Sequence, residues 1–238
     1  MPAERYYIDS ALTIGSTLIL EGTEFHHLAH VMRAAVDDKV DLVNGKGTLA
    51  KATIESVDKK KARLAIQSAE TEDPPTFEVI LAQAMPRLNR LDFILEKGTE
   101  LGMTEIWLFP GVHSERKALT EHQIERMKAI TIAAMKQCGR LYLPKILVKP
   151  PISDWQPPQF PLFFGDVNPS SPNFQNLWNP KAAGLIFAVG PESGFTAQET
   201  QQLIEKNGNG VKLHQSILRT DTASLTALAL VNHWLLSR

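Results

Sequence analysis

Strand-like apolar runs alternate with amphipathic segments throughout the chain after residue 75, and this alternation constrains the fold more than any other feature. Two helical segments lie among the runs, "NRLDFILEKGTELG" at 89–102 and "TEHQIERMKAITIAAMKQCG" at 120–139. Strands that alternate with helices are typical of a parallel sheet covered on both faces. The expected strands are "FEVILAQA", "EIWLF", "KILV", "PLFFGD" and "GLIFAV".

Residues 1–70 have a different sequence pattern. Their short β-rich runs are separated by turn sequences such as "GKG" and "DKKK", and one helical piece, 23–34, interrupts them. This pattern predicts a small closed sheet or barrel. The polar "TEDPP" at 71–75 is expected to be a linker, so that 76–238 forms a second domain. Within that domain, 150–180 is rich in Pro, Asn and Ser and is left largely unassigned.

Composition excludes several classes of protein. The chain has 238 residues and 43% apolar content, which is enough for a substantial core. No apolar run approaches the ~18 residues that a membrane helix needs, and "MPAERYYIDS" lacks the apolar stretch of a secretory signal. The single cysteine, Cys138, excludes an intrachain disulfide and favours a cytoplasmic location. Cys138 itself is interpreted as a buried small residue rather than a nucleophile.

The distribution of charge is more informative than its total. Net charge is −1, but residues 78–150 hold 11 Lys and Arg against 8 Asp and Glu, a surplus of three in the middle third of the chain. Such a surplus indicates an anionic partner. A solvated helix face explains it nearly as well.

The string "IFAVGPESGFTAQE" at 186–199 places a glycine loop between a buried strand and a helix. Thr196 and Glu199 have capping-box spacing, so a helix is expected to begin directly after the loop. Ligands of open α/β sheets bind at this position, beyond the carboxyl ends of strands. Gly190 and Gly194 would let the backbone approach a ligand, and Pro191 would stiffen the loop. A plain strand-to-helix connection is the alternative. The loop matches neither the Walker A nor the dinucleotide-binding pattern.

A second string, "HQSILRTDTAS" at 214–224, leads into a helix expected from about Thr220 to Leu236. Asp221 and Thr222 lie in its first turn, where they suit the free N–H groups. The helix is apolar on almost every side, which predicts burial in a core or against another subunit.

Together, "GPESGF" and "ILRTDTA" resemble the paired signature of the RsmE family. Members are SPOUT-class methyltransferases that use S-adenosylmethionine to modify a uridine of bacterial 16S rRNA. Further pieces occur in the order that the family shows, and the resemblance covers nearly the whole chain. They are "EFHHLAHVMR" at 24–33, "EKGTELG" at 96–102, "SER" at 114–116 and "QCGR" at 137–140.

The resemblance implies an α/β fold in which a carboxyl-terminal trefoil knot follows a small PUA-like, RNA-binding β-barrel. Knots are rare exceptions among protein folds. The two strings would be knot loops that hold S-adenosylmethionine, and no metal would be needed. The family also implies a homodimer through the knot region and the last helix, 222–236. The residues expected to contact the cofactor are Phe164, Gly165, Val189, Gly190, Pro191, Gly194, Leu213, Ile217 and Leu218.

Three residues depart from the family's pattern. Ser193 replaces a usual glycine and Asp221 a usual glutamate, and both changes are conservative in size or charge. Lys136 stands where a glutamate is common and therefore reverses a charge.

Arg219 is the residue expected to carry the chemistry, because it lies between the cofactor-contacting "SIL" and the helix that begins with "TDTA". Capping the helix or pairing with Asp221 is the alternative. Glu192 would accept a proton or, with more weight, orient its loop.

Arginines with bidentate donors suit an RNA-binding pocket, and Arg33, Arg116 and Arg140 are the expected substrate-binding residues. For Arg33 an ordinary solvated side chain is equally compatible, and Arg87 and Arg90 are interpreted as surface residues. His26 and His30 have helical metal-site spacing but too few further ligands for a metal. The family resemblance implies RNA contact or domain docking for them instead.

The function expected from the sequence is methylation of uridine N3 in the decoding region of 16S rRNA. Two alternatives stay open. One is a SPOUT enzyme that acts on tRNA or on a ribose hydroxyl. The other is a ribosome-assembly factor that binds RNA without catalysis.

Overall fold

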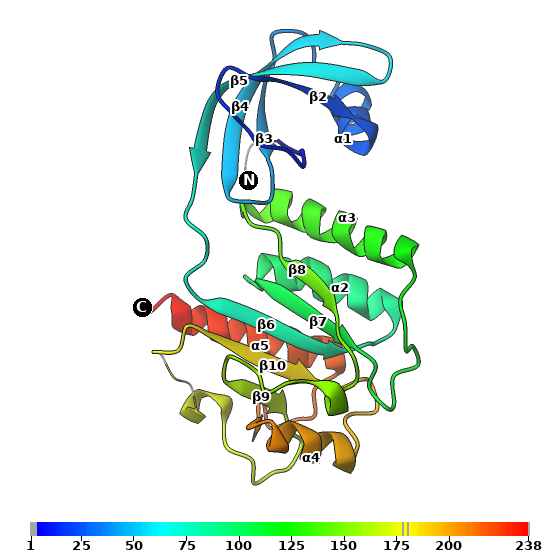
Figure 1. The fold of residues 1–238 in the computed structure, drawn as a ribbon, viewed down its shortest axis with the longest axis vertical. Helices are drawn as coiled ribbons and strands as arrows, with labels where there is room; N and C mark the ends of the chain where they lie inside the picture. The colour runs from blue at the N-terminus through cyan, green and yellow to red at the C-terminus, as the bar shows by residue number, and fades with distance from the viewer. Residues whose placement is uncertain (1–3, 178, 180, 238) are drawn as a thin grey trace. The chain divides into compact units, whose positions relative to one another are not determined.

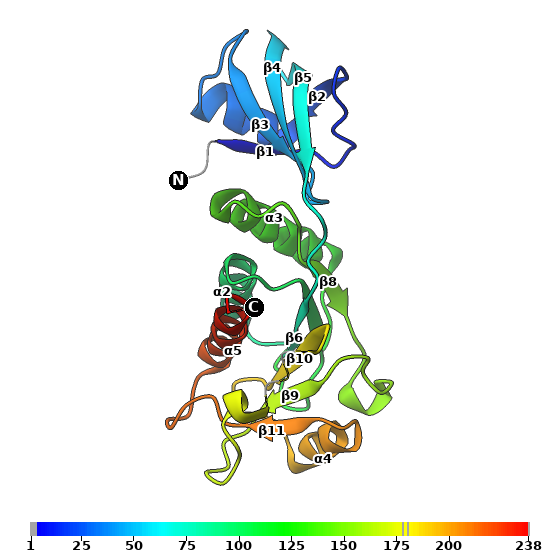
Figure 2. The same cartoon turned by 90° about the vertical axis from the view of Figure 1, so that its left-hand side faces the viewer.

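The computed structural model describes residues 4–177, 179 and 181–237, and its chain forms two compact units. Unit 1 comprises residues up to 74 together with 132–143, and unit 2 comprises 75–131 and 144 onward. Figures 1 and 2 show the strands and helices of both units. The long helix α3, Glu121–Cys138, begins in unit 2 and ends in unit 1.

Unit 1 is built on a five-stranded sheet with the order β1-β3-β4-β5-β2. β1 and β3 are parallel, and the other neighbours are antiparallel. The predicted β-rich runs are confirmed as β2 to β5, whereas the short β1 had no signal in the sequence. The strands are β1 Arg5–Tyr7, β2 Thr17–Glu21, β3 Lys39–Val43, β4 Thr48–Val57 and β5 Lys61–Thr71.

The helix predicted at 23–34 is shorter and less regular than expected. α1, Gly22–His26, continues into a π-helical turn, His27–Val31, and the chain then leaves the helix through Arg33, whose φ is +55°. Phe25 and Leu28 are buried, which fixes the helix on the sheet's core of alternating apolar side chains.

The end of α3 completes unit 1. Met135 and Leu141 pack with Val43 in a small buried cluster, and the Arg5 guanidinium donates to the carbonyl oxygen of Gly139 at 2.7 Å. Lys136, the charge reversal, pairs with Glu24 at 2.6 Å, and each side chain is only about one-fifth exposed. The acidic partner that this lysine needs is therefore supplied by the "EFHH" segment.

Unit 2 contains the predicted parallel sheet, with six strands in the order β11-β9-β10-β6-β7-β8. Every neighbouring pair is parallel. The predicted alternation is thus confirmed. The strands are β6 Glu78–Ala84, β7 Glu105–Phe109, β8 Lys145–Val148, β9 Leu162–Gly165, β10 Gly184–Val189 and β11 Asn209–Val211.

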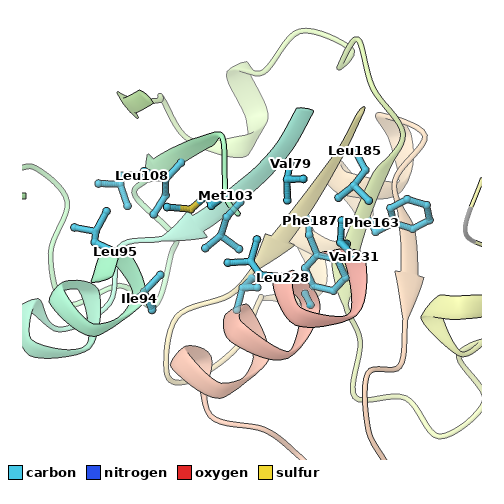
Figure 3. Close-up of a cluster of buried hydrophobic side chains, with 14 of the residues drawn as sticks. Val79, Ile94, Leu95, Met103, Leu108, Phe163, Leu185, Phe187, Leu228 and Val231 are labelled. Carbon is cyan, nitrogen blue, oxygen red and sulfur yellow. The ribbon is translucent and has the colours of Figure 1, made fainter. Parts of the chain in front are cut away.

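Alternate residues of the central strands face two separate cores. On one face, Val79, Leu185 and Phe187 pack with apolar residues of the two helices that cover it, as Figure 3 shows. These helices are α2, Leu88–Glu100, and α5, Thr220–Leu235. On the other face, neighbouring strand residues such as Ile80 and Ile186 pack with Trp155 and Leu203. Leu203 belongs to α4, Ala197–Glu205, and short 3-10 turns at Ile152–Asp154 and Phe174–Leu177 lie in the irregular segment.

The last helix is not buried on every side. Ser224, Ala227, Leu228 and Val231 are buried toward the sheet and α2, whereas Thr222, Ala229, His233 and Leu236 are exposed. One face of α5, with both polar and apolar residues, is thus left open by the described residues.

Candidate active site

The glycine loop has the predicted geometry at the carboxyl end of β10. The strand ends at Val189, and α4 begins at Ala197, directly after its N-cap Thr196. The Thr196 hydroxyl accepts from the Glu199 N–H at 3.1 Å, and the Glu199 carboxylate accepts from the Thr196 N–H at 2.8 Å. The capping box is confirmed, and it fixes where the loop ends.

The two glycines of the loop are needed for different reasons. A Cβ on Gly190 would lie 3.0 Å from the Phe195 nitrogen and 3.1 Å from the Gly194 carbonyl carbon, because the loop folds back on its own main chain. A Cβ on Gly194 would meet nothing within 4 Å, but its φ of +74° disfavours any other residue. Space is the constraint at Gly190, and backbone conformation is the constraint at Gly194.

A buried glutamine joins the loop to the start of α5. Gln83, in β6, is fully buried, and its amide nitrogen donates to the Ala84 carbonyl oxygen at 2.9 Å and to the Thr220 hydroxyl at 3.0 Å. The Thr220 hydroxyl donates in turn to the Gly190 carbonyl oxygen at 2.8 Å. Ser224 donates to the Gln83 carbonyl oxygen at 2.6 Å. The two strings that the sequence singled out therefore meet at this glutamine.

A second link between the strings runs through Arg90, which the sequence analysis interpreted as a surface residue. Its guanidinium lies 3.0 Å from an Asp221 carboxylate oxygen and 3.4 Å from a Glu192 carboxylate oxygen. The Arg87 N–H also donates to Glu192, at 3.1 Å. The Arg87 side chain instead pairs with Glu115 at 2.6 Å, and this hydrogen bond keeps the pKa of the Glu115 carboxyl below its ordinary value.

The loop that follows β7 lies against the glycine loop. The Val112 N–H donates to the Glu199 carboxylate at 2.8 Å, and His113 Nδ1 lies 3.3 Å from the Gly194 carbonyl oxygen. Arg116 belongs to this loop and is exposed. Its expected contact with substrate stays a prediction.

Arg219 is the N-cap residue of α5, but its side chain makes no capping hydrogen bond. The side chain is exposed and forms no ion pair within residues 4–177, 179 and 181–237. Asp221, the alternative partner, binds Arg90 instead. Because the neighbouring Thr220 bonds to Gly190, the backbone of Arg219 lies beside the glycine loop.

Most of the expected cofactor residues lie at the ends of adjacent strands. Phe164 and Gly165 end β9, Val189 ends β10, and β9 pairs with both β10 and β11. A Cβ on Gly165 would meet only Phe187, at 4.0 Å, so a flat ring can approach the backbone there. Leu213 and Leu218 are half-buried, whereas Ile217 is 82% exposed.

This surface fits S-adenosylmethionine. Open backbone at Gly165 and Gly194 suits an adenine ring, and the exposed apolar Ile217 lies in the same segment as Arg219. The contacts of all nine residues, Pro191 included, stay predictions.

Two of the expected substrate residues belong to unit 1. Arg33 is exposed, in its left-handed conformation. Arg140 is half-buried, and this burial lowers the pKa of its guanidinium. The His26 and His30 rings lie with centroids 5.0 Å apart and are tilted by 52° to each other. In the described part of the chain, no cluster of three His, Cys, Asp or Glu side chains could hold a metal ion.

A cavity of about 580 Å³ opens elsewhere in unit 2, near the amino ends of β6, β7 and β8. Trp107, Trp155, Glu78 and Lys145 are among its lining residues. The loops described above leave the opposite, carboxyl ends of the strands. Among the described residues, no helix is both long and apolar enough to cross a membrane.

The last helix of unit 2 thus begins beside the glycine loop, at the carboxyl ends of the parallel strands. Residues 72–232 match the family model of an RNA methyltransferase domain, and residues 20–67 match that of an RNA methyltransferase PUA domain. The fold is accordingly of the α/β trefoil-knot type, preceded by a PUA-like domain, as the sequence predicted.

Comparison with individual relatives identifies the family of RNA methyltransferase to which the chain is similar. A crystal structure of ribosomal RNA small subunit methyltransferase E from Neisseria gonorrhoeae, bound to S-adenosyl methionine, is 30% identical, with a TM-score of 0.87 and 98% of each chain covered. The enzyme of the same name from Bacillus subtilis is 28% identical over 97% of this chain and 96% of its own. The enzyme of the same name from Aquifex aeolicus is 30% identical over 91% of this chain and 94% of its own. The chain belongs to the ribosomal RNA small subunit methyltransferase E family.

The geometry of the two glycines predicts different outcomes for substitution. Gly190→Val should abolish binding of S-adenosylmethionine, because its side chain cannot be placed without opening the loop. Gly194→Ala should weaken binding less, because only the backbone conformation is strained. Calorimetry measures both affinities, and circular dichroism checks that the variants are folded. Unchanged affinity in folded Gly190→Val protein would contradict the assignment of this loop.

Proposed function

We propose that this methyltransferase transfers a methyl group from S-adenosylmethionine to N3 of a uridine in the decoding region of 16S rRNA. Family membership gives the enzyme class and the methyl donor. The observation that supports the site is the hydrogen bond between Thr220 and Gly190, which joins the two loops and leaves Arg219 exposed beside them.

Arg219 is proposed to act on the substrate. Uracil N3 is a poor nucleophile while it is protonated, and its deprotonated form spreads negative charge onto O2 and O4. A fixed guanidinium stabilises that charge as it develops. When it is bound, S-adenosylmethionine supplies an electrophilic methyl group, so that the protein has to align this group with N3 and favour deprotonation.

Glu192 is proposed to orient the glycine loop rather than to accept the proton. Its carboxylate already accepts a hydrogen bond from the Arg87 N–H and lies beside the Arg90 guanidinium. Both contacts hold the carboxylate in place. The candidate for the proton acceptor stays open.

The partner proposed for both units is 16S rRNA or the small ribosomal subunit, which places the enzyme in the cytoplasm. In this proposal, 1–70 is the RNA-binding domain, 71–75 the linker and 76–238 the methyltransferase domain. Arg33, Arg116 and Arg140 would contact RNA. The match of residues 20–67 to an RNA methyltransferase PUA domain supports the first assignment.

A homodimer is part of the proposal. The open face of α5 carries Ala229 and Leu236, the latter 86% exposed, and Phe93 of the adjacent α2 is 45% exposed. Covering this apolar surface with a second copy would remove it from water. Sedimentation at micromolar concentration should therefore give twice the mass of the chain. A monomer under these conditions would remove this part of the proposal.

The function is tested on ribosomal RNA from a strain that lacks the gene. Mass spectrometry of 16S rRNA nucleosides should show the loss of N3-methyluridine, and the restored gene should return it. Loss of a methylated tRNA nucleoside or of a 2′-O-methyl ribose would favour the enzymatic alternatives. Unchanged nucleosides, with no binding of S-adenosylmethionine, would favour the assembly factor.

The role of Arg219 is tested separately. Arg219→Ala should keep its cofactor affinity and melting temperature but lose roughly 10²–10³ in rate, as does the loss of one oxyanion-hole donor. Arg219→Lys should recover little, because a point charge cannot reproduce the planar fork. Single-turnover methylation measures the rate. A folded Arg219→Ala enzyme with near-normal turnover would leave Arg219 a structural residue.

A further inference from the structure

Arg90 occupies an unusual position for an arginine in the first turn of a surface helix. Its side chain is only 22% exposed, and its guanidinium lies between two carboxylates from distant parts of the chain. Glu192 belongs to the glycine loop, and Asp221 belongs to the first turn of α5. These carboxylates are 28% and 20% exposed, so solvent screens the group only partly.

The arginine is what makes the approach of the two carboxylates favourable. Without a cation between them, two like charges would repel each other and push the loops apart. A guanidinium offers donors along different edges of one plane, so a single side chain can bind both partners. The Arg87 N–H adds a neutral donor to Glu192 from the same end of α2. This end of the helix therefore binds both candidate cofactor loops.

We propose that Arg90 is a positioning residue, which holds the loops 190–194 and 217–221 at the spacing that S-adenosylmethionine requires. The inference rests on the proposed function of these loops. Arg90 would act through Glu192 and Asp221, without contact to the methyl donor or to RNA.

This role differs from that of the Gln83 network. Gln83, Thr220 and Ser224 form their hydrogen bonds in the core, whereas the Arg90 group borders solvent. The Arg90 group joins loops rather than strands of the sheet, and loops open at a lower free energy than the core unfolds. Loss of Arg90 should therefore change the mobility of the loops and the affinity for cofactor, with little effect on the melting temperature.

The chain offers a matched control. Arg126 binds Asp92 of α2 through two nitrogens, the closer at 2.6 Å, and among the described residues no hydrogen bond or ion pair joins either side chain to the loops. Arg126→Met thus removes an ion pair to the same helix. Arg90→Met removes the bridge at nearly constant side-chain length, and Arg90→Lys keeps the positive charge.

Two measurements on the full-length protein test the proposal. In the protein without cofactor, hydrogen exchange of residues 190–195 and 217–224 should be faster in Arg90→Met than in the unmodified chain and unchanged in Arg126→Met. Calorimetry with S-adenosylmethionine should show about a tenfold or larger loss of affinity in Arg90→Met, the scale of hydrogen bonds to charged groups. Arg90→Lys should retain more of the cofactor affinity than Arg90→Met does. In Arg90→Met, the KM for S-adenosylmethionine should rise by a larger factor than kcat falls.

The outcomes separate this proposal from the function itself. Unchanged hydrogen exchange in both loops of Arg90→Met, or an equal change in Arg126→Met, would contradict the proposed role of Arg90 even if the enzyme methylates RNA. Normal cofactor affinity with weakened RNA binding would overturn it as well, because Arg90 would then be an RNA contact. If the unmodified protein binds no S-adenosylmethionine, the proposed function fails, while exchange still shows whether Arg90 holds the loops together.

Discussion

The carboxamide of Gln83 fixes the relation between three segments that are remote in sequence. Its nitrogen donates to Ala84 and Thr220, and its oxygen accepts from Ser224. The Thr220 hydroxyl donates in turn to the Gly190 carbonyl oxygen. A buried amide left without partners would cost about 1–3 kcal/mol, so the carboxyl ends of β6 and β10 and the start of α5 are held in one arrangement. The loops at the candidate site depend on that arrangement.

The sequence predicted the parallel sheet, the helices that cover it and the loops because their signals are local. Apolar periodicity identified five strands of unit 2, and the capping box at Thr196 located the start of α4. Gly190 could be recognised in the same way, although the sequence did not reveal that the loop's own backbone closes over it.

The links between the loops could not be predicted from local patterns. Arg90 is separated from Asp221 by 131 residues, and an arginine at the start of an amphipathic helix ordinarily lies in solvent. Gln83 did carry a signal, since it is a polar residue within the otherwise apolar "VILAQAM", but nothing in the sequence identified its partners. Lys136 likewise appeared as a departure until the structure placed Glu24 beside it.

Helix α3 has a consequence for how the chain can acquire its fold during synthesis. The buried cluster in unit 1 combines Val43 with Met135 and Leu141, which belong to the later segment 132–143. Unit 1 is therefore incomplete when residue 74 leaves the ribosome. Residues 75–131 of unit 2 must be synthesised before the missing piece, 132–143, follows. The amino-terminal sheet must therefore wait, with part of its apolar surface uncovered, for a helix that the other domain begins.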